Sequence, residues 1–198
     1  MTRQGRWNGR PDGPSDGEIL ASVLAGDTER FALLVQRHQD VLFGHARAMG
    51  LDRDTAADLV QETFVRAFQR LAHCRDPERF GVWVGRILRN RCLDHLKSAA
   101  VRKRSSLSPS LPTREGDPDR EMEERNLRSA LQTAIDELPP EQREAFVLRH
   151  VDGLDYGTMA ELAETSISAM KMRVHRARER LRARMESIGA AWGVTSPG

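Results

Sequence analysis

Residues 166–185 read SISAMKMRVHRARERLRARM. Apolar side chains recur there at every third or fourth position: Ile167, Met170, Val174, Ala177, Leu181 and Met185. That spacing predicts an α-helix with one seam packed on a core. The other positions are mostly basic, opposed only by Glu179 and the following Glu186. An ordinary surface helix mixes both signs to gain pairs four residues apart, so this composition favours contact with nucleic acid.

Charge is unevenly distributed along the 198 residues, although the formal net charge is only +2. Residues 75–104 are basic, residues 115–137 are acidic, and residues 171–184 are basic again. The near-neutral total therefore conceals two cationic patches. One hypothesis is that the acidic residues 115–124 shield the basic faces in the free protein.

The chain shows no membrane or export signal. No apolar run approaches the ~20 residues that a membrane-spanning helix needs. Residues 1–17, MTRQGRWNGRPDGPSDG, lack the apolar core of a signal peptide. We therefore expect no membrane insertion and a cytoplasmic location.

Reactive and metal-binding groups are sparse. The two cysteines, Cys74 and Cys92, form no disulfide framework, and with His73 and His95 they lack the paired spacing of a zinc site. No nucleophile with an adjacent base and no phosphate-binding loop is recognisable. We expect no catalytic residues, metal, cofactor or small-molecule substrate, and therefore no enzyme.

The sequence divides into two helical domains. Residues 1–17 are rich in glycine, proline and arginine and predict a flexible tail. From residue 18 the helical pattern is almost continuous, and no strand pattern appears. The composition changes to Ser, Pro, Gly and acid over residues 105–120, which predicts a flexible linker. We expect an all-α protein with domains at 18–104 and 121–188 and a C-terminal tail at 189–198.

In the first domain, a long helix should follow Asp27 as its N-cap. His38 and His45 fall on the apolar stripe of that helix and are interpreted as packing residues rather than ligands. Gly50 suits the left-handed conformation at the helix end.

A second helix is expected from the capping residues 52–58 to about Ala72, followed by a third at 80–99. The apolar stripe of the second helix is predicted to be Ala57, Val60, Phe64, Ala67, Phe68 and Leu71. Cys92 shares a side of the third helix with Leu88 and Leu96, which indicates a core position.

In the second domain, a helix over residues 127–138 must stop before Pro139. Pro140 suits the first turn of a helix over 141–150, and a short helix at 156–163 precedes the basic helix. Two helices joined by a short turn, the second cationic, predict a helix-turn-helix for a DNA major groove.

Particular motifs carry a family resemblance. LPPEQREAFVLRHVDGLDYGTMAEL (138–162) and KMRVHRARERL (171–181) resemble region 4, the C-terminal DNA-binding domain of extracytoplasmic-function sigma factors. DLVQETFVRAFQRL (58–71) and FGVWVGRILRNRCLDHLK (80–97) resemble region 2 of that family. The resemblance covers roughly residues 18–188. It implies an initiation factor that binds core RNA polymerase, recognises a bipartite promoter and opens the duplex, with an anti-sigma factor as a further partner.

On the second helix, the resemblance implies a polymerase-binding set: Asp58, Gln61, Glu62, Thr63 and Arg66. A polar, mixed-charge face suits a reversible protein contact. Taken without the resemblance, the same residues describe an ordinary solvated face.

On the third helix and the loop at 73–80, the resemblance implies capture of the minus-ten element as an unstacked single strand. The residues are Trp83, Arg86, Arg89, Asn90, Arg91 and Asp94. The arginines would bind the phosphates of the DNA backbone, and the loop would supply pockets for extruded bases. Trp83 lies among apolar residues, so it is either a core residue or a stacking platform.

On the basic helix, the resemblance implies a minus-35 reading set: Ser168, Lys171, Met172, Arg173, His175, Arg176 and Arg178. Arg and Lys are the side chains that read guanine. The chain departs from the family where glycine is common in the turn, because it has Glu164-Thr165-Ser166. A non-glycine residue in a left-handed turn costs about 1 kcal/mol, which leaves the angle of the helix open. The stretch 138–148 corresponds to the part that contacts the polymerase flap, although Phe146 and Val147 suit a core equally well.

Two other functions are also compatible with the sequence. A stand-alone helix-turn-helix regulator with an N-terminal sensing domain would bind DNA tightly without polymerase. A helical adaptor that binds nucleic acid through charge alone would show steep salt sensitivity and no sequence preference.

Overall fold

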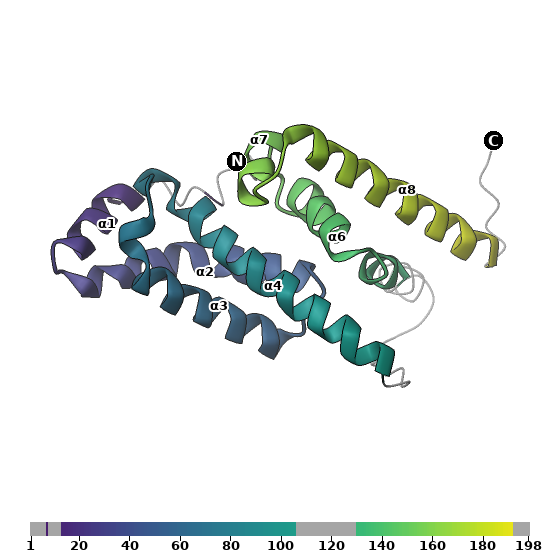
Figure 1. Cartoon of the computed structure of the whole chain (residues 1–198), viewed down its shortest axis with the longest axis horizontal. Coiled ribbons are helices and arrows are strands. Elements are labelled where there is room, and N and C mark those ends of the chain that lie inside the picture. Colours follow the sequence, from purple (N-terminus) through teal and green to yellow (C-terminus); the bar gives the residue numbers. More distant parts are fainter. Residues whose placement is uncertain (1–6, 8–12, 106–129, 192–198) are drawn as a thin grey trace.

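The computed structural model describes residue 7 and residues 13–105 and 130–191. These residues form helices and turns, with no strand among them, as predicted. The first domain contains α1 (Asp16–Leu24), α2 (Phe31–Ala48), α3 (Arg53–Gln69) and α4 (Phe80–Ser105). The second contains helical residues 130–136, then α6 (Pro140–Phe146), a π-helical turn η5 (Val147–Val151), α7 (Tyr156–Leu162) and α8 (Ile167–Ala191) (Figure 1).

Side-chain caps fix several helix starts. Ser15 accepts from the backbone N–H of Glu18, whose carboxylate accepts from the backbone N–H of Ser15, so the domain begins before the predicted residue 18. Asp52 caps α3, as expected, by accepting from the Thr55 backbone N–H at 2.8 Å. The cap predicted at Asp27 is wrong. That residue makes no capping bond and precedes a 3₁₀ turn (Thr28–Arg30).

The predicted stripe of α3 is confirmed in part, because Val60, Phe64, Ala67 and Leu71 are buried. Ala56, Leu59 and Thr63 are buried, whereas Ala57 and Phe68 are exposed. Two neighbouring stripes of α3 are both apolar in sequence. The helical period alone therefore does not identify which stripe faces the core.

Trp7 is buried against α4, although the sequence places it in a flexible tail. Its backbone and ring lie where β-carbons on Gly81 and Gly85 would stand, and its ring meets the edge of His45 at 5.6 Å. Two glycines one turn apart on α4 thus open a slot for the indole. The rest of the predicted tail (1–6 and 8–12) lies outside the described residues.

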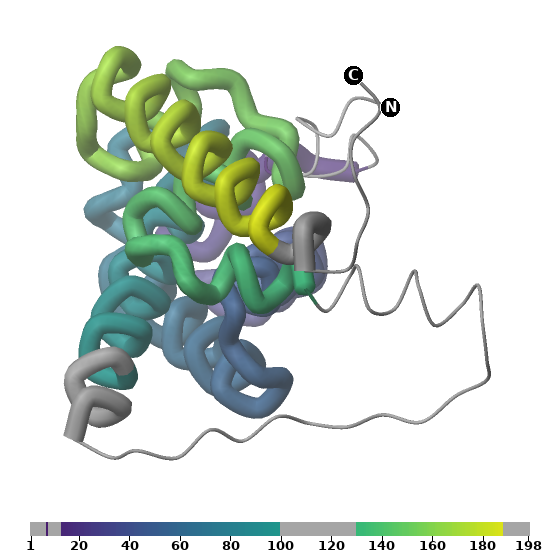
Figure 2. The backbone as a smooth tube through the Cα atoms, turned by 90° about the vertical axis from the view of Figure 1, so that its right-hand side faces the viewer, coloured from purple at the N-terminus to yellow at the C-terminus, as the bar shows by residue number. Residues whose placement is uncertain are grey.

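The two domains share one core. Leu148, Leu154, Met159 and Leu162 of the second domain belong to the same buried cluster as Leu88 of α4. Helices α6 and α7 contact α4, and η5 contacts α2 (Figures 1 and 2). The second domain therefore lies directly on the first.

Other predicted segments fall partly or wholly beyond the description. The linker at 105–120 lies outside the described residues except for Ser105, the last residue of α4. The acidic stretch 115–124 and the start of the predicted helix at 127 also lie outside them. The C-terminal boundary at 188 is too early, because α8 continues to Ala191. No described helix has the length and apolarity needed to cross a bilayer.

Candidate nucleic-acid interface

Helix α8 presents a basic face, held by a helix-turn-helix frame. Met170, Val174 and Ala177 are buried, and the Ser166 hydroxyl accepts from the Ala169 backbone N–H at 3.1 Å at the start of the helix. The turn before it retains a left-handed residue, because Glu164 has φ 50°. Glutamate at this position does not change the turn to another geometry; it adopts the strained one.

Most of the predicted minus-35 residues share that exposed face. The exposed members are Ser168, Lys171, Met172, His175, Arg176 and Arg178. Arg173 is half-buried and lies 3.4 Å from the carboxylate of Glu141 on α6, so it is already paired. The remaining cations are turned outward, where phosphates or base edges can reach them.

His150 lies close to two cations of the second domain. Burial and the nearby guanidinium groups of Arg178 and Arg149 lower the pKa of His150. Burial and the two cations both disfavour the protonated, positively charged form of this imidazole.

The stretch 138–148 is mainly core. Leu138, Ala145, Val147 and Leu148 are buried, and Val147 packs with Met49 and Leu93 of the first domain. Phe146 is half-buried, with its ring 4.7 Å from that of His150. Of the two side chains left open above, Val147 is therefore a core residue.

A second candidate site lies where α4 meets the loop before it. A cavity of about 870 Å³ is bordered by loop residues 70–76, by one side of α4 and by two acids of the second domain, Glu161 and Glu164. Trp83 lines this cavity and also packs on Phe80 at 5.8 Å, so it serves both the core and the cavity wall. Sequence reasoning did not single out Arg70 or Arg79, which supply further cations here.

The three predicted arginines of α4 are not free in this arrangement. Their ion pairs are Arg86 with Glu164, Arg89 with Glu144, and Arg91 with Glu62. Only 11% of the Arg89 side chain is exposed, and Glu144 is fully buried. Asn90 and Asp94 remain exposed. The expectation of open phosphate-binding arginines thus differs from the structure, because acids of the second domain pair with Arg86 and Arg89, and Glu62 of α3 pairs with Arg91.

The thiols are poorly suited to nucleophilic or metal chemistry. Burial and the nearby Asp76 carboxylate raise the pKa of Cys74 to about 11. Burial and Glu144 raise the pKa of Cys92 to about 12, and Cys92 is a core residue, as predicted. Protonated thiols are weak ligands. Within the described part of the chain, no three His, Cys, Asp or Glu side chains gather as a metal site.

Helix α3 offers a polar surface toward solvent. Asp58, Gln61, Glu62 and Arg66 are exposed and border a common hollow. Thr63 does not belong to this surface: it is fully buried and donates its hydroxyl to the Leu59 carbonyl at 2.7 Å. Because its hydroxyl makes this hydrogen bond within the helix, the threonine can occupy a core position.

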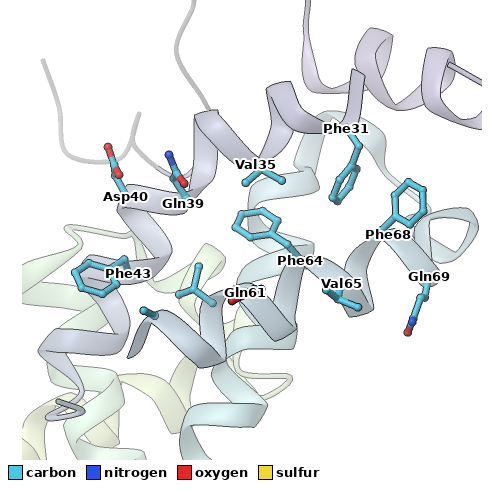
Figure 3. A pocket seen from close by; sticks show the side chains of 12 residues that line it. Phe31, Val35, Gln39, Asp40, Phe43, Gln61, Phe64, Val65, Phe68 and Gln69 are labelled. Atoms are coloured by element: carbon cyan, nitrogen blue, oxygen red, sulfur yellow. The ribbon is translucent and has the colours of Figure 1, made fainter. Parts of the chain in front are cut away.

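An apolar groove between α2 and α3 adjoins this polar surface. It encloses about 630 Å³ and is lined by aromatic and aliphatic side chains from both helices (Figure 3). Phe31 and Phe64 form its floor, while Val65 and Phe68 are 52% and 43% exposed. Sequence reasoning missed the groove, although α3 carries more apolar positions than one buried stripe uses. Exposed apolar side chains gathered beside polar ones are typical of a protein-binding surface.

Comparison with known proteins identifies both halves. The model of Sigma-70 region 2 matches residues 34–102, and that of Sigma-70 region 4 matches residues 128–181. The ECF RNA polymerase sigma factor SigE of Mycolicibacterium smegmatis is 31% identical over 177 residues, which cover 85% of this chain and 68% of SigE.

Solved structures agree with that assignment. CnrH, in complex with the cytosolic domain of CnrY, matches with a TM-score of 0.63 and 28% identity, over 88% of this chain and 99% of CnrH. The sigma factor RpoE of Bartonella quintana, in complex with the anti-sigma factor NepR, matches with a TM-score of 0.56 and 25% identity, over 81% of this chain and 97% of RpoE.

Proposed function

The chain belongs to the extracytoplasmic-function group of the sigma-70 family of RNA polymerase sigma factors, and from this premise we propose how its surfaces divide the work. It binds core RNA polymerase and directs initiation at a bipartite promoter. The assignment of each step to particular residues is our proposal, and so are the domain limits: region 2 from Asp16 to the end of α4, and region 4 from residue 130 to the end of α8.

Helix α8 reads the minus-35 element in the major groove. Support comes from its exposed face, with Lys171 and Arg176 turned to solvent and the short α7 braced behind it. Arg173 orients the helix through Glu141 rather than reading bases. A helix that follows a left-handed turn and presents exposed cations in its first turns fits a major groove.

The loop and the exposed side of α4 take the minus-ten element as a single strand. Arg86, with 38% of its side chain exposed, supplies charge to the backbone, together with Arg79 at the end of the preceding turn. Trp83 and the cavity of about 870 Å³ beside it offer a place for an extruded base.

Helix α3 and the groove beside it bind proteins. The single observation that favours a sigma factor over a stand-alone DNA-binding regulator is this surface: Asp58, Gln61, Glu62 and Arg66 exposed beside an unfilled apolar groove. We assign the polar face to core polymerase. The groove suits an amphipathic helix of an anti-sigma factor, the kind of partner present with the similar RpoE structure.

The chain itself performs no bond chemistry in this scheme. The polymerase makes the transcript, and the chain supplies binding and strand capture. We place the activity in the cytoplasm, together with the polymerase and the chromosome.

Transcription in a defined system tests the proposal. Purified chain and core polymerase are combined with fragmented genomic DNA, and transcript starts are mapped by sequencing. Discrete starts that share two spaced motifs upstream are expected. A chain that protects specific DNA alone, but gives no such starts with polymerase, would instead be a stand-alone regulator.

A surface variant tests the role of α3. Asp58→Asn, Gln61→Ala and Glu62→Gln together should weaken polymerase binding about tenfold or more, since a few residues carry most of an interface energy. Glu29→Gln with Asp54→Asn is the control, because both residues are exposed and lie outside the hollow. Equal loss in both variants would remove the assignment.

A further inference from the structure

Tyr156, at the start of α7, has two cations of the second domain over its ring. The guanidinium carbon of Arg149 lies 4.9 Å from the ring centroid, and the ammonium nitrogen of Lys171 lies 5.8 Å from it. Both distances fall within the ~6 Å over which the negative face of an aromatic ring attracts a cation. Arg149 belongs to η5 and Lys171 to α8, so one ring joins three consecutive helical elements.

The ring of Tyr156 is held in place from two directions. It is half-buried and packs against the buried core cluster that the two domains share. Asp155 caps α7 directly before it, because its carboxylate accepts from the backbone N–H groups of Gly157 at 2.8 Å and Thr158 at 3.0 Å. The cap fixes the backbone and the core contact fixes the side chain, so the ring forms a rigid platform.

The two cations differ in how they are restrained. Arg149 is half-buried and donates to the Leu154 carbonyl at 2.8 Å, so the carbonyl and the ring together hold its guanidinium. Lys171 is exposed near the start of α8. A lysine ammonium stands on a flexible four-carbon stem, so a contact at its end limits the positions that the charge samples. The ring of Tyr156 therefore matters most for Lys171.

The ring also offsets repulsion among the cations around it. Burial and the guanidinium groups of Arg178 and Arg149 lower the pKa of His150, so both arginines lie near this imidazole. Lys171 shares a ring with Arg149 and lies about two helical turns before Arg178 on α8. Like charges brought together repel, whereas the negative face of an aromatic ring attracts each of them. Tyr156 thus stabilises a concentration of positive charge beside the first turns of α8.

We propose that Tyr156 is a positioning residue for minus-35 recognition: its ring holds the ammonium of Lys171 at the major-groove edge of one base pair, so that Lys171 reads a guanine instead of pairing with a phosphate. This rests on the proposed function of α8 as the reading helix. A lysine can neutralise any nearby phosphate or donate to O6 and N7 of guanine, and only the second contact carries sequence information. A residue outside the predicted minus-35 set thereby contributes to specificity without touching DNA.

The contact is measured first in the full chain alone, without DNA or polymerase. The chain has three lysines, Lys97, Lys103 and Lys171, so a lysine-labelled sample gives few NMR signals, and Lys171→Met identifies the one in question. The ε-methylene protons of Lys171 should be shifted upfield by the ring current of Tyr156. Tyr156→Leu should abolish the shift and Tyr156→Phe should retain it. An unshifted Lys171 signal in the wild-type chain would overturn the proposal.

The expected effect on DNA is a loss at one base pair. Core polymerase carrying the full chain is titrated with promoter fragments in which each base pair of the minus-35 element, known from the mapped starts, is replaced in turn. Lys171→Met should remove discrimination of about tenfold at one base pair, as for a lysine–guanine contact. Tyr156→Leu should lower discrimination at the same base pair about threefold, as for the loss of a partly exposed cation–π contact. Tyr156→Phe should keep the wild-type profile.

Phe146→Leu is the matched control, because Phe146 is another half-buried aromatic of the second domain, with its ring beside that of His150. Its profile should follow wild type. In the Lys171→Met background, Tyr156→Leu should cause no further loss at that base pair. A uniform loss over all fragments in Tyr156→Leu, or an additive loss in the double variant, would mean that the ring only supports the fold. A loss in Tyr156→Phe would mean that the hydroxyl acts, and would also overturn the proposal.

The two proposals fail separately. If no polymerase-dependent starts are found but the Lys171 signal responds to Tyr156→Leu, the proposed function falls and the contact between ring and ammonium remains. If starts with a shared upstream motif are found but the Tyr156→Leu profile matches that of Phe146→Leu, the positioning role alone falls.

Discussion

Glu164 joins two effects of opposite sign in one residue. Its left-handed backbone, at φ 50°, is strained by the β-carbon, while its carboxylate gains a pairing with Arg86. The pair is largely exposed, so its contribution is screened by solvent. Substitutions that remove the carboxylate with and without the β-carbon separate the two effects.

Glu164→Gly and Glu164→Ala both remove the ion pair, but only the glycine variant removes the strain. We expect the free energy of unfolding of the glycine variant to exceed that of the alanine variant by about 1 kcal/mol. Urea unfolding of the full chain measures the difference. Alanine equal to or more stable than glycine would show that the turn relaxes and that no strain is stored.

His45 and Asp152 form a second residue-scale link between the domains. Burial opposes protonation of His45, but the carboxylates of Asp152 and Glu144 outweigh it and raise the pKa of His45. The stabilisation is fully present below the unfolded pKa of about 6.5 and is lost as pH rises through the higher folded pKa.

The free energy of unfolding should therefore fall as pH rises above about 6.5. Asp152→Asn should flatten that decline, because its main cause is removed, and should destabilise the chain most at low pH. Asp40→Asn, an exposed change on the same helix as His45, is the control. Parallel pH profiles for wild type and Asp152→Asn would show that the pair does not set the dependence.

At the scale of elements, the sequence predicts helices well and their faces less well. Asp52, Gly50 and the prolines at 139 and 140 mark helix ends through local backbone chemistry, and the structure agrees at each. The buried face of α3 was predicted in part: Val60, Phe64 and Ala67 pack inward as expected, whereas Ala57 and Phe68 line the groove.

Contacts between distant elements were not predictable from the sequence. Arg86 meets Glu164 across 78 residues, and Trp7 reaches α4 from a segment without helical period. Such pairs depend on how the domains dock, which no local pattern encodes. The residue types of the candidate sites were therefore predictable, whereas the pairing of Arg86 and Arg89 with the second domain was not.

The slot for Trp7 on α4 gives an element-scale prediction. A β-carbon on Gly85 would lie 2.1 Å from the Trp7 ring, whereas one on Gly44 of α2 meets nothing within 4 Å. Gly44→Ala should stabilise the chain by about 1 kcal/mol through helix propensity. Gly85→Ala should destabilise it, because the indole is displaced from its buried position.

Trp7→Ala supplies the control for that comparison. In this background, Gly85→Ala should become stabilising, like Gly44→Ala, because the obstacle is gone. Chemical unfolding of the four variants measures the coupling. A destabilising Gly85→Ala in the absence of the indole would mean that another group fills the slot.

At the scale of the whole molecule, the fold brings oppositely charged parts of the chain together. The basic α4 and the acids of α6 and α7 are brought together by the shared core, so much of the cationic surface of the first domain is neutralised internally. The outward face of α8 keeps its charge. Salt therefore weakens two sets of contacts, the exposed ion pairs between the domains and the contacts with DNA.

That competition predicts how strand affinity depends on salt. Screening weakens phosphate contacts, with a slope of about −0.7 per phosphate for single strands. It also weakens the exposed ion pairs that Arg79 and Arg86 make with Glu161 and Glu164. The logarithm of affinity against the logarithm of salt concentration should therefore fall less steeply for wild type than for Glu161→Gln with Glu164→Gln. Fluorescence anisotropy with the minus-ten strand from 50 to 200 mM salt, a range of about fourfold, measures both slopes. The control is Glu137→Gln with Glu179→Gln, which changes the charge of the second domain equally but away from α4, so its slope should follow wild type. Parallel slopes for the Glu161→Gln, Glu164→Gln variant and wild type would mean that these carboxylates do not compete with DNA for Arg79 and Arg86.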